Sequence, residues 1–77
     1  MWTISIAFEA MQDLRSFPRG PAGDVTDIID QLRLDPHPPN SDPVEDTENI
    51  YVLNVAGYTV EYEVITEQRL VKILSVG

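Results

Sequence analysis

The most constraining feature of this sequence is a strict alternation of apolar and polar residues between positions 58 and 64. The apolar positions fall on one side of an extended chain and the polar positions on the other: Tyr58, Val60, Tyr62 and Val64 against Thr59, Glu61 and Glu63. This two-residue period is typical of a β-strand with one buried face and one solvated face. The remaining chain must therefore supply neighbouring strands and a cover for the apolar side.

Two segments rich in β-branched and large apolar residues flank this strand, at positions 50–55 and 70–76. The first connection holds only Ala56 and Gly57, and the second holds positions 66–68. These lengths suit hairpin loops and leave no room for a crossover helix. We therefore predict an antiparallel meander of three strands.

The N-terminal segment changes its hydrophobic period once. Four apolar residues alternate with smaller ones at the start of the chain: Trp2, Ile4, Ile6 and Phe8. They predict a first strand whose apolar side, Phe8 included, faces the core. The next apolar residues recur at helical spacing over positions 9–17: Ala10, Met11, Leu14 and Phe17. We expect a short helix that ends before Pro18, with Met11 and Phe17 in the core.

A second helix follows a turn rich in glycine and proline at positions 19–23. Asp24 is suited to cap this helix, because an aspartate carboxylate accepts hydrogen bonds from the free amides of the first turn. The apolar stripe of the helix consists of Val25, Ile28, Ile29 and Leu32. Asp24, Asp27 and Asp30 lie in its N-terminal half, where the helix dipole favours negative charge. We interpret them as helix-stabilising residues and not as a metal site.

Four prolines interrupt regular structure between positions 35 and 49: Pro36, Pro38, Pro39 and Pro43. The same segment carries Asp42, Glu45, Asp46 and Glu48. We predict an extended, solvated loop, whose acidic residues match neither the spacing nor the glycine of a calcium-binding loop. The only histidine, His37, lies between prolines with no second histidine or cysteine to assist it, so we interpret it as a solvated linker residue.

These elements predict an α+β fold in a single domain of residues 1–77, with a strand, two helices and a three-strand meander. The two helices form a hairpin packed on one face of an antiparallel sheet, where both apolar stripes are buried. The other face stays open. On its central hairpin we expect five side chains, which form our candidate binding site: Val52, Asn54, Thr59, Glu61 and Glu63.

The charge balance limits the function more than any motif does. Thirteen acidic and five basic residues give a net charge of −8, and such a surface repels the phosphates of a nucleic acid. Acidity can serve solubility alone, or it can indicate a basic protein partner.

We expect no disulfide, cofactor or metal site, because the chain has no cysteine and no metal-ligand pattern. No segment reaches the roughly twenty apolar residues that span a bilayer, and the N-terminus lacks the layout of a signal peptide, which favours the cytoplasm.

Short motifs follow one another in a characteristic order along almost the whole chain. They are Glu9-Ala10, Asp13-Leu14 and Phe17-Pro18, then Ile28-Ile29-Asp30-Gln31-Leu32 with Asp35-Pro36, then Tyr51-Val52-Leu53-Asn54-Val55, Gly57-Tyr58-Thr59-Val60-Glu61-Tyr62-Glu63-Val64 and Val71-Lys72-Ile73-Leu74-Ser75-Val76-Gly77. The pattern Gly-Tyr-x-Val-x-Tyr-x-Val, after two helices and before a last strand, is the most specific of them. In this order the motifs resemble the RelE/ParE superfamily of toxin–antitoxin toxins.

The resemblance implies an activity and a partner. RelE-like members cut messenger RNA in the ribosome, ParE-like members inhibit DNA gyrase, and an antitoxin neutralises both. The ribonuclease branch carries basic residues on the open sheet face, at positions that correspond here to Val52, Asn54 and Thr59. A further arginine and the catalytic tyrosine of some members would lie beyond position 77. RNA cleavage needs a proton acceptor, cations for the developing phosphorane charge and an acid; these three residues supply none, and Glu61 and Glu63 add charge of the wrong sign.

We therefore expect a RelE/ParE-like protein of a toxin–antitoxin type system that has no catalytic residues and acts by binding another protein. An antitoxin-like or other basic peptide fits such a surface, and a homodimer through an unpaired strand edge is also open. The alternative is a ribosome-dependent mRNA endonuclease or gyrase-inhibiting toxin whose active residues the sequence does not identify; growth arrest with cleaved transcripts that is lost on mutating Tyr58, Thr59 or Arg69 would favour it. A third interpretation is a truncated or decaying relative without activity. We expect neither direct nucleic-acid binding nor membrane binding.

Overall fold

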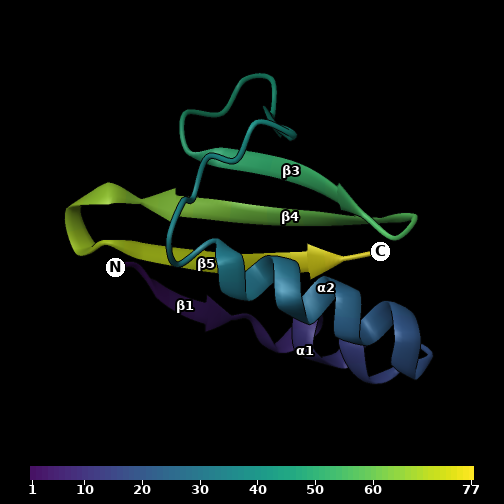
Figure 1. The fold of residues 1–77 in the computed structure, drawn as a ribbon. Coiled ribbons are helices and arrows are strands. Elements are labelled where there is room, and N and C mark those ends of the chain that lie inside the picture. Colours follow the sequence, from purple (N-terminus) through teal and green to yellow (C-terminus); the bar gives the residue numbers. More distant parts are fainter.

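The computed structural model describes residues 1–77 and contains one sheet, two α-helices and a short 3-10 helix (Figure 1). The strands are β1 (Thr3–Ile6), β2 (Ser41–Pro43), β3 (Ile50–Val55), β4 (Tyr58–Ile65) and β5 (Leu70–Val76). The helices are α1 (Phe8–Arg15), α2 (Arg19–Gln31) and the 3-10 helix η1 (Thr66–Gln68). The predicted order of a strand, two helices, a long connection and three strands is confirmed.

The five strands lie in the order β1-β5-β4-β3-β2. β3, β4 and β5 form the predicted antiparallel meander, and β2 pairs antiparallel with the outer side of β3. β1 runs parallel to β5, so the sheet is mixed and not wholly antiparallel as predicted. A parallel neighbour requires a long crossover, which the chain from α1 to β4 provides. β5 therefore lies inside the sheet, and the strand nearest the C-terminus is not an unpaired edge.

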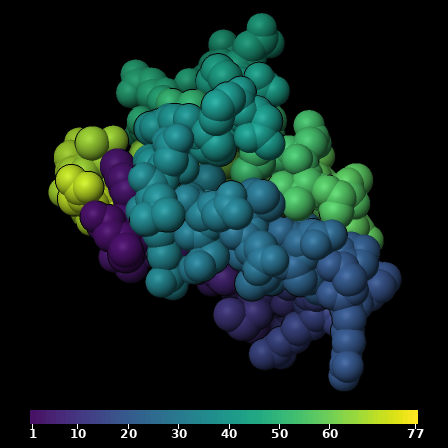
Figure 2. Space-filling view, viewed as in Figure 1, coloured from purple at the N-terminus to yellow at the C-terminus, as the bar shows by residue number.

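One face of the sheet is covered by α1 and α2 (Figure 1). The alternation in β4 is confirmed on this side, where Val60, Tyr62 and Val64 are buried. The apolar residues buried with them come from both helices and the residue after α2, and from strands β3 and β5: Ala10, Val25, Ile29, Leu32, Leu53, Val55, Val71, Ile73 and Val76. Figure 2 shows α2 and the segment after it concealing most of the sheet from this side. No charged side chain is buried, so apolar packing holds this layer together.

The chain leaves the sheet earlier than the alternation predicts. Ala7 still donates its amide hydrogen to the Ile73 carbonyl, at 2.9 Å, and its own carbonyl accepts the first hydrogen bond of α1 from Met11. Phe8 therefore belongs to the helix and is 74% exposed, so its predicted place in the core is wrong. The core position predicted for Met11 is also wrong, because this side chain lies on the outer side of α1 and is 41% exposed.

α1 turns a partly polar stripe toward the sheet. Ala10 is fully buried, and the Asp13 carboxylate accepts a hydrogen bond from the Val76 amide at 3.2 Å. This polar contact, which hydrophobic periodicity does not reveal, fixes the helix to the end of β5. Phe17 lies beyond the helix, which ends earlier than predicted, and stacks its ring on Tyr58 with 4.1 Å between the ring centroids.

α2 begins well before its predicted cap. Positions 19–23 are helical instead of forming a turn, and Asp24 lies inside the helix, so its predicted capping role is wrong. The reason is the placement of the prolines: Pro18 stands at the N-cap and Pro21 in the first turn, where amide donors lack an intrahelical partner. The first intrahelical bond joins the Ala22 amide to the Pro18 carbonyl at 3.0 Å. These prolines therefore start a helix that they were expected to prevent.

The segment at positions 35–49 is mostly exposed, as predicted, but it contains the short edge strand β2. The Tyr62 hydroxyl donates a hydrogen bond to the Pro36 carbonyl at 2.9 Å, which attaches this segment to β4. His37 is exposed, and its ring meets Tyr51 edge-on with 4.9 Å between the centroids. None of the helices is long and apolar enough to cross a bilayer.

Candidate functional site

The open face of the sheet holds all five residues of the candidate site. In the register of β3 and β4, Val52 faces Glu61 and Asn54 faces Thr59, so these side chains share one face, as the alternation predicts. Glu63 continues the same side of β4. Asn54 and Thr59 are exposed, whereas the other three are half-buried among their neighbours. Their role in binding remains a prediction.

The exposed pair near the β3-β4 hairpin is linked directly. Thr59 donates a hydrogen bond from Oγ1 to Asn54 Oδ1 at 2.9 Å. The two hairpin residues, Ala56 and Gly57, both have positive φ angles, 51° and 83°, and a turn of this kind matches the right-handed twist of the flanking strands. This end of the face therefore offers neutral hydrogen-bonding groups held at a fixed register.

The charged part of the open face lies farther along β4. Glu63 pairs with Lys72 of β5, and Glu61 pairs with Ser75 across a register shift. The sequence alone does not fix which side of the last strand faces the core, because apolar residues populate both sides of it. The structure buries Val71, Ile73 and Val76 and leaves Lys72 exposed. Lys72 is thus a member of the open face that the sequence analysis missed, although antiparallel pairing across the β4-β5 turn would have placed it opposite Glu63.

Apolar side chains also reach the open face beside the glutamates. Ile50 pairs with Glu63, and Ile65 pairs with Leu70 at the other end of the β4-β5 hairpin. Ile50, Ile65 and Leu70 are all half-buried. With Val52 they make the face amphipathic, which suits a partner that carries both apolar and basic side chains.

The basic side chains do not converge on this face. Only Lys72 lies on the strands that carry it, and the other four occupy separate places: Arg15 at the end of α1, Arg19 at the start of α2, Arg33 after α2 and Arg69 before β5. The Arg69 guanidinium lies 5.3 Å from the centroid of the Trp2 ring, and Arg33 Nε lies 3.2 Å from Asp30 Oδ1. A phosphate on the open face would therefore meet one lysine beside two glutamates.

The tyrosines lie on the opposite side of the sheet from the candidate site. Burial raises the pKa of the Tyr62 hydroxyl above its usual value, and the polar side chain of Ser41 partly opposes that rise. This hydroxyl already donates to the Pro36 carbonyl. Tyr58 stacks on Phe17 on the covered side. Neither phenol is placed to exchange a proton with a ligand on the open face.

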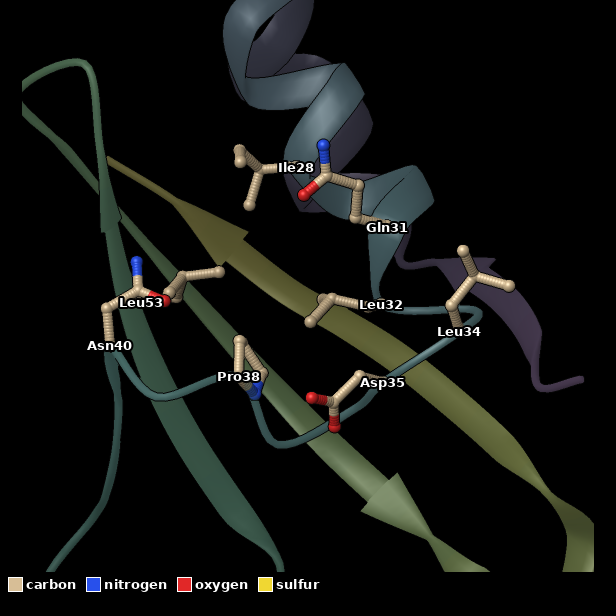
Figure 3. Close-up of a pocket in the computed structure, with 8 residues that line it drawn as sticks. All are labelled: Ile28, Gln31, Leu32, Leu34, Asp35, Pro38, Asn40 and Leu53. Atoms are coloured by element: carbon tan, nitrogen blue, oxygen red, sulfur yellow. The ribbon is translucent and has the colours of Figure 1, made fainter.

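A hollow of about 450 Å³ lies between α2, β3 and the segment that leads to β2 (Figure 3). Its lining comes from separate parts of the chain: Ile28, Gln31, Leu32, Leu34, Asp35, Pro38, Asn40 and Leu53. Asp35 is the only charged residue in it, and no basic residue lines it. No group of three or more histidine, cysteine, aspartate or glutamate side chains is arranged to hold a metal ion. The sequence analysis did not foresee this hollow, because its lining depends on long-range packing.

The arrangement of strands and helices matches solved structures of RelE toxins over the full chain. The crystal structure of the intact E. coli RelBE toxin–antitoxin complex gives a TM-score of 0.87 at 19% identity, covering 100% of this chain and 95% of that chain. The isolated E. coli RelE toxin gives 0.88 at 18% identity, with 100% and 83% covered. The archaeal RelE-RelB complex from Pyrococcus horikoshii OT3 gives 0.88 at 22% identity, with 97% and 91% covered.

No protein-family model matches the sequence, and no curated protein matches it. The chain nevertheless has the RelE toxin fold over its full length, so the fold expected from the resemblance is confirmed. With this identity of 18–22%, the likeness establishes the fold. The chemistry must be argued from the side chains that this sequence places on that fold.

Proposed function

We propose that this chain is a RelE-like protein of a toxin–antitoxin type system that acts by binding another protein and has no ribonuclease activity. The observation that carries the proposal is the charge of the open face. Glu61 and Glu63 lie there with Lys72 as the single basic residue, while four arginines are dispersed over other elements. The RelE fold supports the assignment to this type of system.

The chemistry of the open face argues against phosphodiester cleavage. Asn54 and Thr59 are neutral and hydrogen-bonded to each other, so they neither accept a proton readily nor stabilise a phosphorane. A glutamate could serve as a base, but a phosphate about 5 Å away from one is repelled by about 3 kcal/mol at an effective dielectric constant near 20. One lysine beside two carboxylates does not reverse that repulsion.

A basic, amphipathic segment of an antitoxin-like protein is the partner that suits this face best. Similar structures include RelE toxins crystallised with RelB antitoxins, in the E. coli and P. horikoshii complexes. The half-buried Ile50, Val52 and Ile65 offer apolar contacts, and the two glutamates beside them select for lysine or arginine. Complementary charge also accelerates encounter and makes it sensitive to salt.

Binding of the protein co-encoded with this chain tests the proposal. We expect a sub-micromolar dissociation constant that rises with salt, measured by titration calorimetry. The double substitution Glu61→Lys with Glu63→Lys should weaken binding by at least about tenfold, because like charges across an interface oppose association. The same charge change at Glu45 and Glu48, in the exposed segment before β3, is the matched control. Absence of binding, or equal losses from both double variants, would contradict the proposal.

Induced expression tests the alternative of an mRNA endonuclease or gyrase-inhibiting toxin. The three residues whose mutation would reveal such an activity lie apart: Tyr58 on the covered side, Thr59 on the open face and Arg69 over Trp2. We expect no cleaved transcripts and no gyrase inhibition. Growth arrest with cleaved transcripts, abolished by Thr59→Ala or Arg69→Ala in a folded protein, would overturn our preference. A missing basic tail encoded directly downstream would instead favour a decayed relative.

A further inference from the structure

The two edges of the sheet differ in how they are protected against pairing with another strand. β2 is three residues long and contains Asp42 and Pro43, and short length, charge and proline all discourage edge pairing. β1 has the sequence Thr-Ile-Ser-Ile, with neither charge nor proline. At four residues β1 is nearly as short as β2, but it lacks the charge and the proline of the β2 edge.

Hydrogen bonds identify the backbone groups that β1 leaves free. Thr3 donates its amide hydrogen to the Arg69 carbonyl, and Ala7 donates to the Ile73 carbonyl, both at 2.9 Å on the β5 side. Along a strand, the backbone amide and carbonyl groups of successive residues point to alternate sides. Because Thr3 and Ala7 point toward β5, the amide and carbonyl groups of Ile4 and Ile6 point away from it. Trp2, just before the strand, is already bonded to the Arg33 carbonyl. The free edge is therefore centred on Ser5.

All four of the large apolar side chains that are exposed in this protein belong to the surroundings of this edge. Met1 (81% exposed) precedes β1, and Leu34 (76%) adjoins the Arg33 carbonyl that binds Trp2 at the same end. Phe8 (74%) and Met11 (41%) follow β1 at the other end, on one side of α1. In Figure 2 the purple N-terminal residues reach the surface at the margin of the molecule. An exposed apolar group thus flanks each end of an unprotected edge.

We propose that this edge is a homodimer interface in which β1 pairs antiparallel with β1 of a second copy, across a two-fold axis at Ser5. Ile4 then exchanges both backbone hydrogen bonds with the partner's Ile6, and the two Ser5 side chains face each other as a non-hydrogen-bonded pair. The same axis brings the Met1 end of each copy to the Phe8 end of the other. The edge is therefore complementary to itself.

The exposed area is sufficient for a weak dimer. The four apolar side chains and the β1 edge expose on the order of 600 Å² per copy, or about 1,200 Å² for two, which is the lower limit of specific interfaces. The net charge of −8 opposes association. The acidic segment at positions 42–48 lies beside β2, at the opposite edge, whereas Asp27 and Asp30 line a hollow with Ile4 and Ile6, so part of the repulsion arises beside β1 itself. At about 4.8 Å per strand the two edges are roughly 19 Å apart, beyond the Debye length of about 8 Å in physiological salt.

Light scattering on the untagged 77-residue chain tests this interface through Ser5, whose side chain is exposed. We expect a concentration-dependent dimer that strengthens with salt, because salt screens the repulsion between two acidic copies. This trend is opposite to that expected for a basic partner on the open face, so the two proposals can fail independently. Ser5→Glu and Ser5→Lys should each give monomers, because like charges meet across the axis. An equimolar mixture of the two variants should restore a heterodimer.

Ser5→Glu is compatible with the folded monomer, since Ser5 is the register neighbour of Lys72, and circular dichroism checks the fold of each variant. Thr59→Glu, on β4 of the same face, is the matched control and should leave the dimer unchanged. A wild-type chain that stays monomeric at the highest concentration that light scattering can reach would overturn the proposal. The proposal would also be overturned if the Ser5→Glu variant formed dimers, or if the equimolar mixture of Ser5→Glu and Ser5→Lys stayed monomeric.

Discussion

The two faces of the sheet are built from the same strands but obey different constraints. On the covered face, Val60, Tyr62 and Val64 are at most 2% exposed and pack beneath two helices. On the open face, Thr59 is exposed and Glu61 is only half-buried. The covered face must keep its volume and polarity to hold the fold, whereas the open face can change charge with little effect on stability. A RelE fold and an acidic open face can therefore coexist in one chain.

The largest expected contrast between the faces is between neighbouring residues of β3. Leu53 is 1% exposed in the core, whereas Asn54 is exposed on the open face. Leu53→Ala should destabilise the protein by about 2–5 kcal/mol, because it removes buried contacts and leaves a cavity. Asn54→Ala should cost about 0.5 kcal/mol, since it removes one exposed hydrogen bond. Urea unfolding measures both, and equal losses would contradict the comparison.

The next contrast is between two tyrosines of β4. Tyr62→Phe should destabilise the protein by about 1–3 kcal/mol, because it leaves the Pro36 carbonyl without the buried hydroxyl that donates to it at 2.9 Å. Tyr58→Phe is the matched control, since the Tyr58 hydroxyl makes no hydrogen bond within the protein. Thermal unfolding of the two variants should therefore differ clearly. A loss of the same size for Tyr58→Phe would show that the hydroxyl contact does not anchor the segment before β2.

The covered face could be predicted from the sequence because its signal is local. The alternation around Val60 and the stripe that includes Val25 and Ile29 follow from periods of two and of about 3.6 residues. Helix starts were less predictable, since Asp24 offers a cap but Pro18 and Pro21 begin the helix earlier. Proline in a first turn and proline in a turn between helices look the same in a sequence.

The residues of the open face could be predicted only on β3 and β4, where the short hairpin loop fixes the pairing of the strands. Val52 and Asn54 followed from the two-residue loop between β3 and β4, which fixes their pairing. Lys72 did not, because apolar residues occupy both sides of β5 and the register shifts near Glu61. The parallel pairing of β1 with β5 joins residues far apart in the chain and has no local signal. The unprotected edge therefore became visible only in the structure.

The buried hydroxyl of Tyr62 also makes the covered face sensitive to alkaline pH. Burial raises the folded-state pKa of this group above the value of about 10 expected when the chain is unfolded. The folded state then binds the proton more tightly, so this contribution is complete below about pH 10 and is lost as pH rises through the folded pKa. Between the two pKa values stability should fall by about 1.4 kcal/mol per pH unit. Tyr62→Phe should remove this part of the pH dependence in urea titrations.

The smallest expected change in stability is in α2, one of the two helices that cover one face of the sheet and leave the other open. Gly23 lies inside α2, and a Cβ atom added there meets nothing within 4 Å. Gly23→Ala should stabilise the protein by about 0.5–1 kcal/mol, because alanine loses less backbone entropy than glycine in a helix. Gly20→Ala, equally unobstructed but in the first turn, is the matched control and should gain less, since the backbone is less restricted there. If both variants gained the same free energy of unfolding in chemical denaturation, α2 would be as firmly formed at its proline-rich start as in its interior. The helical layer over the sheet would then include the whole of α2.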